Sequence, residues 1–154
     1  MIKISSSELL PYTAQLQVPS RLDSLAEVLS WFAELAYPSI PQSIWLRCQL
    51  ALAEGFTNAV RHAHQNLPPD DLFVEISVSV QQGEIIILIW DYGPSFNLIQ
   101  KLEQLSAQTI DKNATGGRGL KLIKDIADEL SYERTADHHN CLKIVKYWQS
   151  GDSI

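Results

Sequence analysis

Hydrophobic and polar positions follow regular spacings along the first 90 residues of the chain. Residues 13–18 alternate polar and apolar side chains, which predicts a half-buried strand. Residues 21–36 and 42–66 repeat apolar side chains at helical spacing, so each segment predicts an amphipathic helix. Residues 72–80 alternate again, and 84–90 (EIIILIW) are apolar enough to form a strand in the middle of a sheet.

The second half begins with a turn at 91–96 and a short helical segment at 98–105, and the apolar content then stays thin up to residue 116. A helix is predicted at 120–130, and a hairpin is predicted from strands at 132–135 and 142–148. The elements predict an α+β fold, a two-layer α/β sandwich whose mixed, mostly antiparallel sheet is covered on one face by helices. Strands and helices fail to alternate, which excludes a doubly wound nucleotide fold.

Length and charge limit the kind of protein further. A chain of 154 residues predicts one domain, 1–154, and a hydrophobic content of 45% excludes a disordered chain. A net charge of -6 argues against nucleic acid as a direct partner, because such binding relies on Lys and Arg. No apolar run is long enough to span a membrane, and the N-terminus lacks the pattern of a signal peptide. Cys48 and Cys141 are expected to be thiols of a cytoplasmic protein rather than a disulfide.

The helix predicted at 42–66 has two faces of different chemistry. Glu54, Asn58, Arg61 and His62 share one side of it. The opposite, core-facing stripe consists of Trp45, Cys48, Leu52, Phe56, Ala59 and Ala63. The polar side is either a solvated surface or a site where Glu54 and Asn58 place a general base beside a hydrated divalent cation.

Asp91-Tyr92-Gly93 follows the most apolar strand directly. A carboxylate at the end of a buried strand has lost water and needs a hydrogen-bond donor. The sequence allows two donors to Asp91: the exocyclic amine of adenine, or a backbone N–H in a tight turn. Gly93 would let the backbone approach a flat ligand closely.

A glycine-rich loop leads into the next predicted helix at residues 115–120 (TGGRGL). Free N–H groups at a helix start attract phosphate, and Arg118 would add a charged hydrogen bond. The alternative is a flexible loop with a glycine cap. The spacing lacks the Gly-Lys-Ser/Thr ending of a P-loop and the acidic residue of a dinucleotide fingerprint.

In this order, the three segments resemble the boxes of the Bergerat-fold ATPases, the superfamily of histidine kinases, gyrase B subunits and MutL-type proteins. Residues 54–62 (EGFTNAVRH) resemble the N-box, 91–93 (DYG) the first glycine box, and 117–120 (GRGL) the second. The resemblance covers about 40–148 and makes 97–116 the ATP lid. Without an attached phosphoacceptor domain, the chain is most similar to the anti-sigma-factor serine/threonine kinases of bacteria.

The resemblance implies ATP and Mg2+ as cofactors and a role for each matched residue. Glu54 would be the general base and Asn58 the Mg2+ ligand, while His62 would orient the N-box or contact the ligand. Asp91 would accept a hydrogen bond from the adenine amino group, and Gly93 would clear space for the ring. The phosphate-binding residues would be Thr115, Gly117, Arg118, Gly119 and Leu120.

The last hairpin departs from the family pattern. His139-Asn140-Cys141 stand where many relatives carry Gly-Thr, so a hydroxyl contact near the adenine is lost or replaced. His138 and His139 are adjacent but lack a third ligand nearby, and we expect them to be exposed loop residues rather than a metal site.

The function that the resemblance implies is an ATP-dependent protein serine/threonine kinase that acts as an anti-sigma factor. Its partners would be a sigma factor and the anti-sigma-factor antagonist that it phosphorylates, with a homodimer also expected. The alternatives are a catalytically silent ATP-binding module that sequesters a partner, and a module that regulates something other than sigma. Partner choice depends on surface residues outside the boxes, so the sequence leaves these alternatives open.

Overall fold

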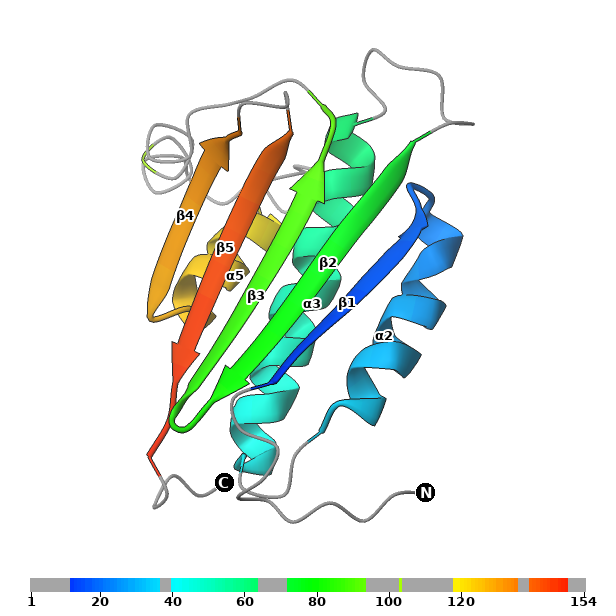
Figure 1. Ribbon diagram of the computed structural model, residues 1–154. Helices are drawn as coiled ribbons and strands as arrows, with labels where there is room; N and C mark the ends of the chain where they lie inside the picture. The colour runs from blue at the N-terminus through cyan, green and yellow to red at the C-terminus, as the bar shows by residue number, and fades with distance from the viewer. Residues whose placement is uncertain are drawn as a thin grey trace.

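A computed structural model describes residues 12–36, 40–63, 72–93, 103, 118–135 and 139–149. Its five strands form one sheet in the order β1-β2-β3-β5-β4, and all four pairings are antiparallel. The helices lie together on one face of this sheet (Figure 1). The predicted α+β sandwich is therefore confirmed, except that the described sheet is wholly antiparallel rather than mixed, and β3 occupies the central position that its apolar sequence predicted.

The elements follow the predicted order, with small shifts at their ends. They are β1 (Tyr12–Pro19), η1 (Leu22–Ser24), α2 (Leu25–Glu34), α3 (Gln42–Ala63), β2 (Phe73–Gln81), β3 (Glu84–Asp91), α5 (Arg118–Ile126), β4 (Glu129–Arg134) and β5 (Asn140–Tyr147). Asp91, expected in a turn, is instead the last residue of β3 and pairs with Asn140 of β5. That pairing fixes the direction in which the Asp91 side chain points.

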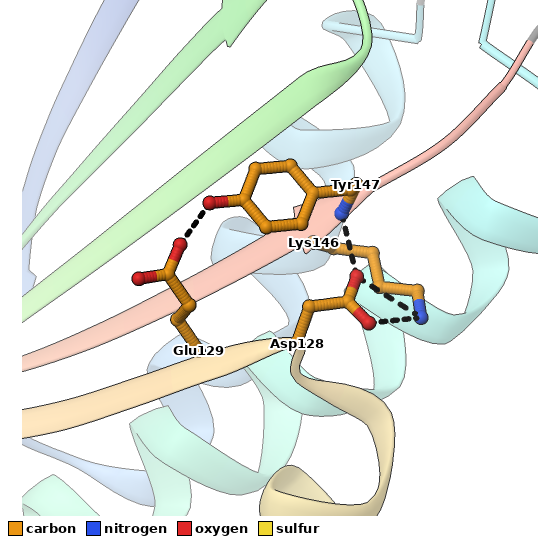
Figure 2. A network of polar contacts seen from close by, with 4 residues as sticks. All are labelled: Asp128, Glu129, Lys146 and Tyr147. Carbon is orange, nitrogen blue, oxygen red and sulfur yellow. Dashed lines mark hydrogen bonds and ion pairs between the residues drawn. The ribbon is translucent and has the colours of Figure 1, made fainter.

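The helix predicted at 120–130 ends earlier, at Ile126, so Leu130 belongs to β4 and not to the helix. The reason lies in Asp128, whose backbone N–H donates to the Val145 carbonyl at 2.8 Å and so joins the chain to β5. Figure 2 shows the side chain of Asp128 accepting from the Tyr147 backbone N–H at 2.7 Å and forming an ion pair with Lys146. Tyr147 also donates its hydroxyl proton to Glu129. These polar contacts with β5 require an extended backbone after Ile126, so the helix ends there although the apolar spacing continues to Leu130.

The core lies between the sheet and the helices, and α3 packs close to the sheet at Gly55. A β-carbon at this glycine would lie 2.5 Å from Ile89 Cδ1 and 3.5 Å from Leu142 Cδ2, so only glycine fits without a shift. The predicted apolar stripe of α3 is buried wherever the structure describes its side chains, and Ala51 and Val60 widen it. This close contact sets the height of α3 above β3 and β5.

Several predictions fall outside the described residues. The proposed lid, 97–116, is described only at Glu103, which is helical, so the lid and the single-domain boundary stay predictions. The side chain of Ala63 and residue His138 are also not described. Both cysteines are free thiols as predicted, with Cys48 buried and Cys141 half-buried. No helix within the described segments is long and apolar enough to cross a membrane.

Candidate functional site

The start of α5 lies against the polar side of α3. A β-carbon on Gly119 would meet Glu54 Oε2 at 2.5 Å and Asn58 Nδ2 at 3.3 Å. Two segments that are 60 or more residues apart in the sequence therefore meet at the positions that the sequence singled out. Glycine is needed at residue 119 because any side chain there would displace the Glu54 carboxylate.

Glu54 and Asn58 are half-buried, whereas Arg61 on the same side is exposed. Of the two interpretations of this helix face, a purely solvated surface does not describe Glu54 and Asn58. A carboxylate and an amide one turn apart supply oxygen ligands of the kind that a hydrated Mg2+ accepts. The described residues contain no cluster of three or more His, Cys, Asp or Glu that would hold a metal without help, so phosphate oxygens and water would complete such a site.

The second glycine-rich segment is described only from the first residue of α5. Arg118 begins the helix, and Gly119 follows in its first turn. Leu120 is 4% exposed, so its side chain packs in the core and only its backbone can face a ligand. Thr115, Gly117 and the Arg118 side chain lie outside the described residues, so their predicted phosphate contacts stay predictions.

Asp91, at the end of β3, is 4% exposed and receives two hydrogen bonds on one oxygen. The Gly93 backbone N–H donates to Oδ1 at 2.8 Å, and Asn140 Nδ2 donates to the same atom at 2.9 Å. The turn N–H that the sequence offered as one possible donor is thus present. Among the described residues, both donors to this carboxylate bind Oδ1. Oδ2 can therefore still accept a hydrogen bond from a ligand.

Burial raises the pKa of the Asp91 carboxyl above its ordinary value, because the charged form has lost its hydration. The hydrogen bonds from Asn140 and Gly93 oppose that rise in pKa, and the positive charges of His62 and Arg134 oppose it further. His62, predicted to serve the N-box, therefore acts electrostatically on the carboxylate of the first glycine box. The polar side of α3 thus lies against Gly119 and influences Asp91 only through the charge of His62.

The loop between β4 and β5 contributes an aromatic contact beside the Asp91 turn. The rings of Tyr92 and His139 meet edge to face with their centroids 4.1 Å apart. His139 is half-buried by this arrangement, so the expectation that it is simply exposed is wrong. Its hydrophobic partner lies in a different loop, which sequence spacing does not reveal.

Sequence reasoning missed two residues of this end of the molecule. Arg134 donates to Asn140 Oδ1 at 3.2 Å and to the Gly93 carbonyl at 3.4 Å. Asn140 was noted as a departure from the family pattern, but its bond to Asp91 was not expected. The available signal was the hairpin register, which places Arg134 opposite Asn140 once both strands are extended to their observed ends.

Known proteins resemble this chain in sequence and in fold. The family model described as a histidine kinase-like ATPase domain matches residues 18–146. The serine-protein kinase RsbW of Bacillus pumilus is 35% identical over 89 residues, which are 55% of each chain. RsbW of Bacillus subtilis is 27% identical over 69% of this chain and 66% of its own length. The aligned part thus spans about half to two thirds of these two relatives.

A relative from Bordetella bronchiseptica aligns over a larger share of both chains. The serine/threonine-protein kinase BtrW is 26% identical over 88% of this chain and 94% of its own length. A crystal structure of the RsbU and RsbW domains of a Mycobacterium tuberculosis protein superposes with a TM-score of 0.51. The superposition covers 87% of this chain and 32% of the Mycobacterium tuberculosis chain, with 14% sequence identity. At that identity, the similarity shows the fold alone.

Proposed function

The chain belongs to the histidine kinase-like ATPase domain family, and from that membership we propose that it is an ATP-dependent protein serine/threonine kinase. The observation that carries the proposal is the contact between Gly119 of α5 and the Glu54–Asn58 side of α3. It brings a helix start, a carboxylate and an amide together. Phosphoryl transfer needs these three elements for positioning and charge neutralisation.

At the base-binding end, Asp91 holds the adenine. Oδ2 accepts a hydrogen bond from the amino group of the base, while Oδ1 is held by Gly93 and Asn140. The low exposure of Asp91 strengthens this bond because water does not compete for the carboxylate. Gly93 is also buried and leaves room for the ring.

At the reacting end, Glu54 takes the proton from the serine or threonine hydroxyl of the protein substrate. Asn58, one helical turn away, is the residue that would hold Mg2+, and its amide nitrogen would lie 3.3 Å from a β-carbon on Gly119. Its amide oxygen would be the ligand atom, because the oxygen carries the free lone pairs and the amide nitrogen only donates hydrogen bonds. Bound Mg2+ would supply neutralisation of the phosphate charge that builds up during transfer.

The phosphate groups lie at the N-terminus of α5. Backbone N–H groups of Gly119 and Leu120 point along the helix toward its start, where the macrodipole favours negative charge. Thr115, Gly117 and Arg118 complete this cradle in the proposal. Because the attraction comes from backbone dipoles and one arginine, it is compatible with the acidic net charge of the chain.

The biological role we propose is that of a cytoplasmic anti-sigma factor. Several relatives bear the name serine-protein kinase RsbW, which supports the kinase activity, and the role in partner switching is what the sequence resemblance implies. The chain would bind a sigma factor, release it when an antagonist protein binds, and phosphorylate that antagonist. A homodimer is part of this proposal. The competing proposal is a silent ATP-binding module that sequesters its partner without chemistry.

The test is phosphoprotein formation from Mg-ATP and the cognate antagonist by three forms of the protein. These are the wild type, Glu54→Gln, which keeps the size of the side chain, and Glu34→Gln as a matched control on α2, where Glu34 is exposed. Loss of the general base is expected to slow transfer by about 10²–10⁴-fold. ATP affinity, measured in parallel by calorimetry, should stay within a few fold.

The outcomes separate the two proposals. A slow Glu54→Gln beside an active Glu34→Gln supports the kinase. If all three forms bind ATP and none makes phosphoprotein, the silent module is correct. If the wild type binds no ATP with or without Mg2+, both proposals fail.

A further inference from the structure

Three polar residues form one row across the end of the sheet. Arg134 of β4 lies opposite Asn140 of β5, and Asn140 lies opposite Asp91 of β3. Asn140 is fully buried and Asp91 nearly so, whereas Arg134 belongs to the edge strand and reaches solvent. The row therefore connects the buried carboxylate to a cation at the surface through a single amide.

The hydrogen bonds of Asn140 determine the orientation of its amide. Its oxygen faces the guanidinium of Arg134 at 3.2 Å, and a guanidinium can only donate. Its nitrogen lies 2.9 Å from Asp91 Oδ1 and 2.5 Å from the Gly93 carbonyl oxygen, both of which accept. Reversing the amide would place oxygen against oxygen and nitrogen against a donor. Asparagine has the one donor and one acceptor group that this position requires.

The effect on Asp91 is directional. Oδ1 is occupied by the Asn140 amide and the Gly93 N–H, so rotation of the carboxylate would break both bonds. Arg134 also donates to the Gly93 carbonyl at 3.4 Å, which joins the turn after β3 to the edge strand. A carboxylate held in this way presents Oδ2 in one direction only.

We propose that Asn140 and Arg134 are positioning residues that hold Asp91 Oδ1 so that Oδ2 selects a base carrying an amino group over one carrying an oxygen. This inference rests on the proposed function, because it requires a nucleotide beside Asp91. It goes beyond that function in one respect: the preference for an amino-bearing base depends on Asn140 and Arg134 as well as on Asp91.

The measurement is the ratio of ITP to ATP dissociation constants, because inosine replaces the amino group with an oxygen. The variants are Asn140→Leu, of similar size but apolar, Asn140→Asp, and Arg134→Gln. Arg134→Gln is expected to fold because the side chain is exposed on the edge strand. Glu133→Gln on the same strand is the control, since Glu133 is exposed and outside the row. Thermal unfolding of every variant is recorded.

For Asn140→Leu we expect the preference for ATP over ITP to fall by on the order of tenfold or more, because Asp91 is free to rotate. Arg134→Gln should lose part of the preference, and Glu133→Gln none. A purely structural role would lower the affinity for both nucleotides in proportion and leave the ratio unchanged.

Asn140→Asp gives a second, pH-dependent readout. At about pH 8 the introduced carboxylate faces Asp91 Oδ1 and the Gly93 carbonyl, and the preference for ATP is lost. At about pH 5.5 the proton shared by the two carboxyls restores a donor to Oδ1, so the preference partly returns. The other groups acting on Asp91 are His62 from α3 and Arg134 from β4, and Tyr132 and Cys141 lie near enough to feel its charge. The wild type measured at both pH values corrects for their titration.

The proposal is overturned if the wild type prefers ATP and Asn140→Leu, Asn140→Asp and Arg134→Gln all keep the wild-type ratio. It is also overturned if the Asn140→Asp preference does not change with pH relative to wild type. If the wild type binds no ATP, the proposed function itself fails. The two failures are thus told apart by the wild-type titration.

Discussion

Gly119→Ala is the perturbation that tests the contact between α3 and α5 most directly. The added methyl group would lie 2.5 Å from Glu54 Oε2 and 3.4 Å from Glu54 Cδ. The atom in its way is the end of a flexible side chain that is half-buried, so the carboxylate moves and the backbones of the two helices stay. The change therefore affects the chemistry of the site more than the fold.

The expected magnitudes differ for stability and for activity. Glu54 Oε2 must withdraw by about 1 Å to regain van der Waals separation, and a displacement of that size costs about 10²-fold in rate. Replacing a helical glycine by alanine favours folding by up to about 1 kcal/mol, which offsets the strain of moving the side chain. We expect the free energy of unfolding to change by less than about 1 kcal/mol.

Gly55→Ala is the matched control, because its methyl group would also approach another atom to 2.5 Å. That atom is Ile89 Cδ1, and Ile89 is 1% exposed in the core. Overpacking there costs about 1–3 kcal/mol before the gain in helix propensity, so Gly55→Ala should be the less stable variant.

The assays are urea unfolding and phosphoprotein formation from Mg-ATP and the cognate antagonist. Two results would refute the reasoning. One is phosphoprotein formation by Gly119→Ala at the wild-type rate, which would mean that the contact between Gly119 and Glu54 has no part in the reaction. The other is a larger loss of stability in Gly119→Ala than in Gly55→Ala, which would mean that Glu54 cannot move aside.

Three further predictions concern ligand binding, stability and thiol chemistry. ATP at 100 times its dissociation constant should stabilise the fold by about 2.7 kcal/mol, and an unchanged melting temperature would exclude nucleotide binding. Because burial raises the pKa of Asp91, the native state holds its proton more tightly than the unfolded chain, so this group's contribution to stability falls as pH rises from about 4 through its native pKa. Asp91→Asn should therefore gain stability relative to wild type over that pH range while losing ATP binding, which chemical unfolding at several pH values measures. Burial raises the pKa of Cys48 to about 12 and that of Cys141 to about 11. Both thiols should therefore react slowly with iodoacetamide at about pH 8 until the protein unfolds. Fast labelling of the native protein would contradict this.

Most of the secondary structure could be predicted because it depends on local periodicity. The central strand, the hairpin at its start and the amphipathic α3 follow from apolar spacing and turn residues. The turn before β3 contains Gly83 at φ 80°, a conformation that favours glycine. The end of α5 could not be predicted, since the bonds from Asp128 to β5 outweigh an apolar pattern that continues to Leu130.

The candidate site divides in the same way. Glu54, Asn58, Asp91 and Gly119 stood out because their residue types and spacing are unusual for the elements that carry them. Arg134 did not stand out, because a charged residue near the end of an edge strand is ordinary in a sequence. Only its bond to Asn140 gives it significance.

The sequence by itself determined the kinds of element, their order and the chemical groups available for a nucleotide site. Tertiary structure decided which of those groups meet: Gly119 with Glu54, and Asp91 with Asn140 and Arg134. The physical reason is range. Periodicity and turn preference act between neighbours in the chain, whereas these contacts depend on how closely α3 packs at Gly55 and on the register of β3, β5 and β4.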